Sequence, residues 1–339
     1  MRILVSLLGA QGDAVARATA LGKLLTARGH SLTFLGDFPE NALQEITALP
    51  AQALKQVTDQ QFDALLVAAL GGPDRLAAIA RRLPTLVWVQ ESFLDLMGLK
   101  GDFVHWVTLF RLARRIVFMT ERQKDKTFAS FTAGLDDKIV AMASGAPADI
   151  AKLRVPTEKE HLGVVMHAPV LPNKRQQDLI AAGERLRDYN LSFTFIGEKQ
   201  GLAGMPEGMR KIIERHPDRY NFVGYQTASQ TRALLAKNEL YVHTSSDEAW
   251  PQSVIDAAAM GLPLMLSEIE AFSKLWVHGV NCLKFPINNP DFLASSLRMV
   301  LQDDVLRNNL SVQAANTAKR FSEQRFYGAM LQMVEGLKP

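Results

Sequence analysis

Two acidic residues with seven residues between them lie where a predicted strand passes into a predicted helix. Glu248 is in the polar loop after a strand that ends at His243, and Asp256 follows in the helix that starts near Pro251. That helix is apolar except at its start, so Asp256 is costly to bury unless hydroxyl groups or a cation meet it. The free N–H groups at the start of a helix suit a diphosphate. The alternative interpretation is that both acids lie on the surface.

Two further strand-to-helix loops carry residues suited to binding anions. Lys174 and Arg175 begin a helix directly after a strand, where a cation gains nothing from the positive helix end. This placement favours phosphate binding over a merely solvated helix start. The loop after the first strand carries Gly9, Gly12 and Asp13. Glycines there let an anionic ligand approach the backbone, although a turn glycine and an N-cap aspartate explain the same residues.

The strands and helices that must position these loops alternate along the chain. Continuous apolar runs, typical of parallel strands buried on both faces, separate stretches with helical spacing. Strands are expected at Arg2–Leu8, Ser31–Leu35, Ala64–Ala69, Leu86–Val89, Ile116–Met119, Lys138–Ala141, Gly163–Met166, Ser192–Ile196, Tyr220–Val223, Glu239–Val242 and Leu264–Leu266. Helices are expected at Asp13–Arg28, Arg175–Tyr189 and, three in number, over residues 290–337. The alternation predicts an α/β fold with doubly wound parallel sheets.

Length, charge and cysteine content narrow the class of protein. The 339 residues suit two domains of ~150 residues each. A turn-rich, charged stretch over residues 145–160 predicts the boundary, and two such halves would form a deep cleft. The 38 basic and 35 acidic residues nearly balance, so bulk charge does not imply nucleic-acid binding. The lone Cys282, expected to be buried, and the absence of a long apolar run predict a cytoplasmic enzyme.

Around Glu248 the sequence resembles the GT-B glycosyltransferases of the retaining family GT4. Their signature is Glu-x7-Glu at the start of a helix ending in Ala-Met-Ala-x-Gly-x-Pro. Here Glu248 and Asp256 stand at that spacing and residues 257–263 follow in near match. Lys174 stands at the family's lysine. The same order of motifs continues through Phe195-Ile196-Gly197, Asn221-Phe222-Val223-Gly224-Tyr225 and Asn281-Cys282-Leu283-Lys284-Phe285, so the similarity covers most of the second half.

The resemblance implies two Rossmann-like domains, an enzyme and a division of labour. Residues 1–150 would bind the acceptor, residues 151–320 a nucleotide sugar, and a helix over residues 321–339 would cross back to the first domain. A hexose-like sugar would pass from a nucleoside diphosphate to the acceptor with retention of configuration. The nucleotide sugar would be a co-substrate, and no metal or other cofactor is expected.

The resemblance also assigns roles to residues of the second half. Lys174 would neutralise the diphosphate and Glu248 would hold the donor sugar. Asp256 would accept the ribose hydroxyls. Further contacts with the donor are expected at the start of the helix, from Pro251, Gln252, Ser253 and Val254. Gly197 and Tyr225 would line the region of the base and the sugar.

Two departures from the family pattern leave an alternative open. Ala168 and Pro169 stand where members have Gly-Arg, so the arginine that would share the diphosphate is missing, and Arg175 is the hypothetical substitute. The second acid is Asp256, shorter than Glu by one methylene. The alternative is a degenerate GT-B module that acts as a non-catalytic partner or binds a sugar nucleotide without turnover. A nicotinamide-dependent oxidoreductase is opposed by the missing G-x-G-x-x-G.

The first half matches the family more loosely. Residues 29–33 are similar to a segment that ends the first helix in many GT-B enzymes, and Gly9, Gly12 and Asp13 are similar to the Gly-x-x-Gly-Asp loop of lipid-acting families. These three residues are therefore candidates for binding the acceptor, which would be a glycan, a glycolipid or another molecule. Glu91 falls near the place of a histidine that faces the donor sugar. It is a third candidate catalytic residue beside Lys174 and Glu248, although capping the next segment explains it equally well.

The stretch over residues 103–118 has an apolar face with arginines beside it. Trp106, Val107, Phe110 and Ala113 share the face, and Arg111, Arg114 and Arg115 flank it. Such a helix would dock at the inner face of an anionic membrane. Interior packing with a solvated basic edge is the more common arrangement of an amphipathic helix.

Overall fold

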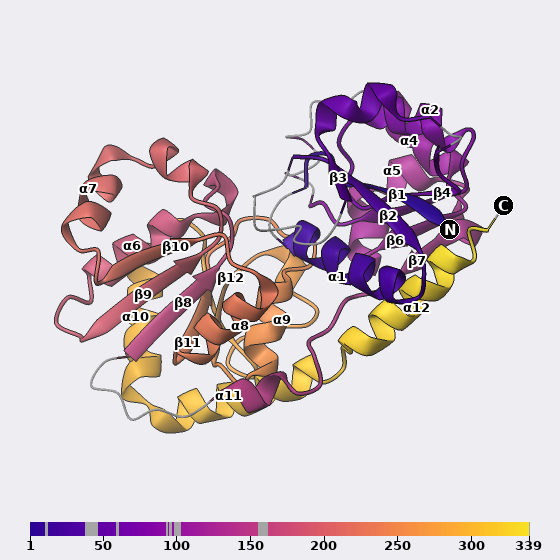
Figure 1. The fold of residues 1–339 in the computed structure, drawn as a ribbon. Coiled ribbons are helices and arrows are strands. Elements are labelled where there is room, and N and C mark those ends of the chain that lie inside the picture. The colour runs from indigo at the N-terminus through magenta and orange to yellow at the C-terminus, as the bar shows by residue number, and fades with distance from the viewer. Residues whose placement is uncertain are drawn as a thin grey trace. The chain divides into compact units, whose positions relative to one another are not determined.

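The protein divides into two compact units. A computed structural model describes residues 1–10, 13–37, 47–58, 61–92, 94, 97, 103–154 and 162–338, without the side chains of residues 13, 54 and 55. Unit 1 comprises Met1–Ser144 and Gln324–Pro339, and unit 2 comprises Gly145–Glu323. The division falls at residue 144, beside the stretch where the sequence predicts a boundary, and the C-terminal segment belongs with the first unit (Figure 1).

Unit 1 is built on a parallel sheet of seven strands in the order β3-β2-β1-β4-β5-β6-β7. The central strands are buried at every position because helices cover both faces of the sheet. The strands are β1 Arg2–Ser6, β2 Ser31–Leu35, β3 Thr47–Leu49, β4 Ala64–Val67, β5 Thr85–Val89, β6 Arg115–Phe118 and β7 Ile139–Ala141.

The helices of unit 1 pack on opposite faces of this sheet. Side chains of α2 and α4 join alternate residues of β4 and β5 in one apolar cluster. On the other face the ring of Phe326, in α12, lies 5.5 Å from that of Trp88, and the Tyr327 hydroxyl donates to the Arg17 carbonyl. The helices are α1 Asp13–Ala27, α2 Pro73–Ala80, α4 Phe103–Leu112, α5 Ala129–Thr132 and α12 Glu323–Glu335.

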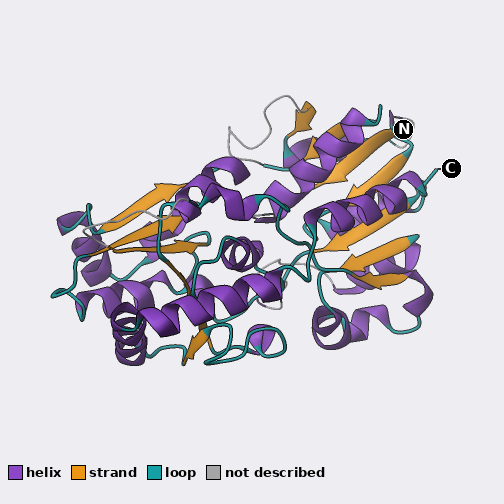
Figure 2. Ribbon diagram, turned by 90° about the horizontal axis from the view of Figure 1, so that it is seen from below, coloured by secondary structure: helices purple, strands orange, loops and turns teal. Residues whose placement is uncertain are grey.

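Unit 2 repeats the plan with a parallel sheet of six strands in the order β10-β9-β8-β11-β12-β13. The strands are β8 Leu162–His167, β9 Leu191–Ile196, β10 Tyr220–Gly224, β11 Leu240–His243, β12 Leu264–Ser267 and β13 Leu283–Phe285. One apolar cluster joins α6 and α10 to one face, and a second joins α8, α9 and α11 to the other. Figure 2 shows helices beside the strands of both sheets. The helices are α6 Gln176–Glu184, α7 Glu207–Arg215, α8 Ala228–Ala236, α9 Gln252–Ala259, α10 Pro290–Gln302 and α11 Asp304–Ala318.

The predicted α/β class and the paired parallel sheets are confirmed, with differences at the sheet edges and helix ends. The short strands β3 and β13 lie at edges and were not expected. The helix expected over residues 175–189 ends at Glu184, because the Arg185 amide turns to the Ala182 and Gly183 carbonyls. The helix expected to end before Gly29 does so, and Gly29 has a φ of 83° that L side chains rarely adopt. Cys282 is buried, as expected.

None of the helices in the described ranges is long and apolar enough to cross a membrane. The apolar face proposed for membrane docking lies inside unit 1. Trp106, Phe110 and Ala113 are buried in the cluster under the sheet, and α4 ends at Leu112. Interior packing therefore accounts for that face.

Candidate active site

The order of the strands brings two of the predicted loops of unit 2 together. The strands that follow β8 are first added on one side of it, as β9 and β10, and then on its other side, as β11, β12 and β13. The order of the strands therefore reverses between β8 and β11. In open α/β sheets, ligands bind beyond the carboxyl ends of the strands at such a switch point. Lys174 lies in the loop after β8 and Glu248 in the loop after β11. Tyr241 pairs with Val165, which brings the ends of these strands level.

Lys174 and Glu248 form a buried ion pair at this point. Lys174 Nζ donates to Glu248 Oε1 over 2.8 Å, and the residues are 7% and 8% exposed. The two loops are also joined through the backbone. The Thr244 hydroxyl donates to the Lys174 carbonyl over 2.7 Å, and the Ser246 amide donates to the Asn173 carbonyl over 2.7 Å. The pair is thus held in place by both loops.

The Glu248 carboxyl stays ionised in spite of its burial. Burial alone would raise its pKa, but the charge of Lys174 and the hydrogen bond from His243 outweigh this effect and hold the pKa well below its ordinary value. A buried carboxylate that keeps its charge is suited to accept hydrogen bonds from hydroxyl groups of a ligand.

His243 is a site residue to which the sequence assigned no role. Its Nε2 lies 2.8 Å from Glu248 Oε1, and its Nδ1 lies 3.0 Å from the Tyr241 hydroxyl. That hydroxyl reaches Ser253 Oγ, in the first turn of α9, over 2.8 Å. A histidine at the end of a strand whose other residues are apolar is the signal that was available in the sequence.

Asp256 is held by two side chains of unit 2. Gln252 Nε2 donates to its Oδ1 over 2.8 Å, and Arg232 Nε donates to its Oδ2 over 3.4 Å. Arg232 also donates to Glu323 over 3.1 Å. The acid is buried, and the cation that its burial requires comes from α8. No sequence pattern points to Arg232.

Arg175 is turned toward its own helix. Its Nε and Nη2 donate to the two carboxylate oxygens of Asp178, over 2.8 and 2.9 Å. Arg175 has a φ of 55° at the start of α6. The structure therefore places its guanidinium on Asp178, whereas Lys174 beside it points to Glu248.

The other predicted donor residues of unit 2 surround the same strand ends. Pro251 stands before the first residue of α9, and Gln252, Ser253 and Val254 form the first turn. The Gly197 amide donates to the Gly224 carbonyl over 3.0 Å at the ends of β9 and β10, and the half-buried Tyr225 follows.

The predicted acceptor residues lie in unit 1. Gly9 lies just beyond β1, Gly12 is outside the described residues, and Asp13 begins α1 with its side chain outside the described part. Glu91 is buried, and its carboxylate accepts the Leu70 amide over 2.7 Å and the Gln90 amide over 3.0 Å. Both carboxylate oxygens of Glu91 thus accept backbone amides of residues that precede it, whereas the alternative offered by the sequence was capping of the next segment.

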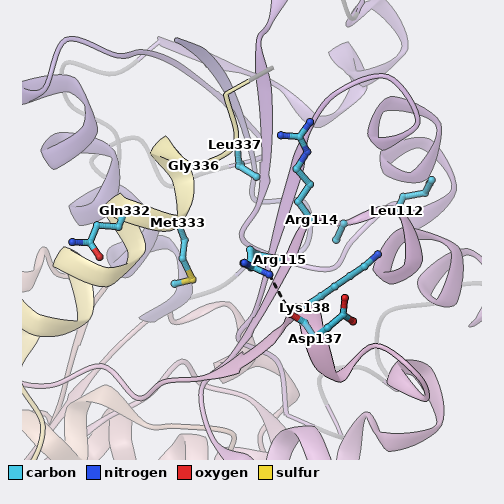
Figure 3. A pocket seen from close by; sticks show the side chains of 10 residues that line it. Leu112, Arg114, Arg115, Asp137, Lys138, Gln332, Met333, Gly336 and Leu337 are labelled. Atoms are coloured by element: carbon cyan, nitrogen blue, oxygen red, sulfur yellow. Dashed lines mark hydrogen bonds between the residues drawn. The ribbon is translucent and has the colours of Figure 1, made fainter.

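A hollow of about 600 Å³ in unit 1 lies beside the residues at which β6 and β7 begin. Figure 3 shows the side chains that line it. It is lined by cations that precede β6 and β7. Lys138 Nζ donates to the Arg111 carbonyl in the last turn of α4, and Arg114 donates to the Lys338 carbonyl beyond α12. Cations are favourable at helix ends where carbonyls are exposed. Bonds to backbone carbonyls at the end of α4 and beyond α12 therefore account for these two cations.

Within the described part of the chain, no cluster of three or more His, Cys, Asp or Glu residues is arranged to hold a metal ion. The charged groups at the switch point of unit 2 are instead the Lys174–Glu248 pair and the Arg232–Asp256 pair.

A family model described as glycosyl transferases group 1 matches residues 148–317, half of the chain. The chain belongs to this family. Its fold is that of the GT-B glycosyltransferases. The Anabaena protein Alr3699/HepE, solved in complex with UDP-glucose, has a TM-score of 0.79 at 16% identity, with 99% of this chain and 100% of that chain covered.

Two named relatives share sequence with the chain. A phosphatidyl-myo-inositol mannosyltransferase of Mycobacterium tuberculosis is 26% identical over 185 residues, which are 44% of this chain and 49% of that protein. The chain thus matches about half the length of this relative. The lipopolysaccharide core biosynthesis glycosyltransferase LpsE of Rhizobium meliloti is 24% identical over 277 residues, 77% of this chain and 76% of the relative.

Proposed function

We propose that the chain moves a hexose-like sugar from a nucleoside diphosphate sugar to an acceptor, with retention of configuration and without a metal ion. The observation that carries the proposal is the buried contact of Lys174 with Glu248 at the switch point of unit 2, next to the first turn of α9. The family of the chain and the Glu-x7-Asp spacing support the reaction class.

Under this proposal the site stabilises the departing diphosphate with a side-chain cation and with the start of a helix. Negative charge grows on the diphosphate as the bond to the sugar breaks. Lys174 and the amides of the first turn of α9 would stabilise that charge. Glu248 Oε1 is already engaged by Lys174 and His243, so we assign Oε2 to the hydroxyls of the donor sugar. Asp256, oriented by Gln252 and Arg232, would accept the ribose hydroxyls.

The relatives suggest which substrates to try first. UDP-glucose is bound in one structural neighbour, and the named relatives act in mannosyl transfer to phosphatidyl-myo-inositol and in lipopolysaccharide core synthesis. We therefore propose a glycan or glycolipid acceptor, bound by unit 1 near Gly9, Gly12, Asp13 and Glu91. A cytoplasmic location is part of the same proposal, with peripheral membrane contact where the acceptor is a glycolipid.

A transfer assay with UDP-, GDP- and ADP-sugars tests the proposal. The double variant Lys174→Ala, Glu248→Ala should lose transfer because both donor contacts disappear together. The matched control is Lys211→Ala, Glu207→Ala, which removes an exposed ion pair from α7 in the same unit. Full transfer by the first variant would contradict the assignment of the site. A thermal-shift screen against UDP, GDP, ADP and NAD identifies the nucleotide, since a ligand at 100 times its Kd adds ~2.7 kcal/mol.

A sugar-nucleotide binder without turnover is the second candidate function. Two observations favour it: Pro169 stands where the family has an arginine, and both oxygens of Asp256 are already engaged within unit 2. Tight binding of a nucleoside diphosphate without transfer or donor hydrolysis, across a broad panel of acceptors, would support this candidate over the enzyme.

A further inference from the structure

A chain of buried side chains connects the two ends of the proposed donor site. It runs from Ser253 in α9 through Tyr241 and His243 in β11 to Glu248, and ends at Lys174. Every link is between 2.8 and 3.0 Å long. Each of the five residues is buried, with His243 only 1% exposed. Such a network keeps its geometry because its members have no water to exchange with.

The direction of the central hydrogen bond follows from the chemistry of its partners. The Glu248 carboxylate can only accept, so the proton between it and His243 resides on Nε2. The ring is fixed on its other edge by the Tyr241 hydroxyl at Nδ1. Its face is fixed by Phe272, whose ring lies edge-on with its centroid 5.9 Å away. His243 therefore has one orientation, in which it holds Glu248 Oε1.

We infer that His243 is a positioning residue of the donor site, which holds Glu248 in register with the start of α9 through Tyr241 and Ser253. This inference rests on the proposed function. Glu248 Oε1 then accepts hydrogen bonds from two donors, Lys174 Nζ and His243 Nε2. When a diphosphate draws Lys174 toward itself, His243 keeps Glu248 aimed at the sugar. His243 should consequently matter for binding and transferring the sugar, and much less for binding the nucleoside diphosphate alone.

Two amide substitutions separate the two edges of the imidazole. In His243→Gln the side-chain amide reaches the place of Nε2 and can still donate to Glu248. In His243→Asn the amide reaches only the place of Nδ1, so the contact with Glu248 is lost. Tyr241→Phe removes the hydroxyl alone. The matched control is Tyr220→Phe in the same sheet, which removes a buried hydroxyl that contacts Glu184 outside the network.

The measurements are kcat and KM for the donor sugar and the Kd of the free nucleoside diphosphate. A hydrogen bond to a charged group corresponds to roughly a 10- to 100-fold change, and a neutral one to roughly 5-fold. We expect His243→Asn to lower kcat/KM by the larger factor and Tyr241→Phe by the smaller one. His243→Gln should recover most of the activity, and the Kd of the diphosphate should stay within about threefold in each variant.

Several outcomes would overturn the inference. Unchanged kcat/KM in folded His243→Asn would do so, as would an equal loss in His243→Gln. A parallel loss of diphosphate affinity would show a merely structural role. If the unaltered chain binds donor without transfer, the ratio of affinities for the nucleotide sugar and the free diphosphate replaces kcat/KM, and His243→Asn should abolish that preference. If the unaltered chain binds no nucleotide at all, the proposed function fails first.

Discussion

At the scale of single residues, the Lys174–Glu248 pair stabilises unit 2 only while both partners are present. Removing one partner of a buried ion pair leaves the other charge uncompensated, at a cost of about 3 kcal/mol or more. Lys174→Met keeps the aliphatic stem but removes the ammonium. We expect it to lower the free energy of unfolding by about that amount at pH 7. Chemical denaturation measures the change, and Lys211→Met on the exposed face of α7 is the control.

The pH dependence of that loss identifies its cause. In the unaltered protein the pKa of Glu248 is depressed, so its contribution is present above the ordinary value of 4.5 and is lost as the pH falls below it. Without Lys174 the folded-state pKa rises, because burial still disfavours the charge. In the variant, Glu248 can then become neutral by taking up a proton, which removes the uncompensated buried charge. The gap in stability between the two proteins should therefore be widest at pH 7 and narrow as the pH falls toward 4.5; a constant gap would point to lost packing instead.

Asp256 offers a second residue-scale prediction, which separates ribose recognition from stability. If its carboxylate accepts the ribose hydroxyls, Asp256→Asn should weaken binding of a nucleoside diphosphate by roughly 10- to 100-fold, as for one charged hydrogen bond. The 2′-deoxy analogue lacks one of the hydroxyls and should lose less affinity in the same variant. Calorimetric titration of both nucleotides completes a double-mutant cycle. Equal losses for the two nucleotides would assign Asp256 to the network of Gln252 and Arg232 alone.

At the scale of elements, the sequence predicts what depends on local pattern and misses what depends on contacts distant in sequence. The central strands are predictable because a strand buried on both faces is a nearly continuous apolar run. The edge strand β3 has three residues, of which two are exposed, so it lacks that pattern. Lys174 and Glu248 are predictable as neighbours because their loops follow adjacent strands. The partner of Arg175 and the role of His243 depend on side-chain directions that spacing does not encode.

The end of β9 lies against the loop after β8, and this close approach leads to a prediction at the scale of elements. Gly197 has a φ of 138°, and a Cβ built there would lie 2.3 Å from the Ala168 carbonyl oxygen. Gly197→Ala should therefore destabilise unit 2 by about 1–3 kcal/mol. It should also weaken nucleotide binding, since the displaced loop continues to Lys174. Thermal unfolding and nucleotide titration measure the two effects.

A matched glycine in the same unit provides the control. Gly208 lies in α7, and a Cβ added there meets no atom within 4 Å. Gly208→Ala should stabilise the protein by about 0.5–1 kcal/mol, because alanine is the better helix former. Similar behaviour of the two alanine variants would contradict the argument from the Gly197 backbone.

At the scale of the whole molecule, each unit has its own apolar core, and the last helix completes the core of the first. The near-neutral net charge says little about function, because the charges that matter are placed singly at the switch point of unit 2. The chain is long enough to form two sheets. Its C-terminal segment, which contains α12, packs in unit 1. The buried residues that α12 and its extension contribute are Phe326, Tyr327, Met330, Leu331, Val334 and Leu337.

Truncation after Glu323 should therefore unfold unit 1 and spare unit 2. Each fully buried apolar side chain contributes about 1.5–3 kcal/mol, so losing this helix removes about as much as a domain's whole stability. Trp88, which packs on Phe326, and Trp106 lie in unit 1, whereas Trp250 and Trp276 lie in unit 2. We expect the truncated chain to lose one of two unfolding transitions, to expose the first two tryptophans to a quencher, and to keep its affinity for the nucleoside diphosphate.

The full chain with Glu335→Gln, which loses only contacts with Arg28 and His30, should keep both transitions. A truncated chain that retains the unit 1 transition would show that the seven-stranded sheet is stable without α12.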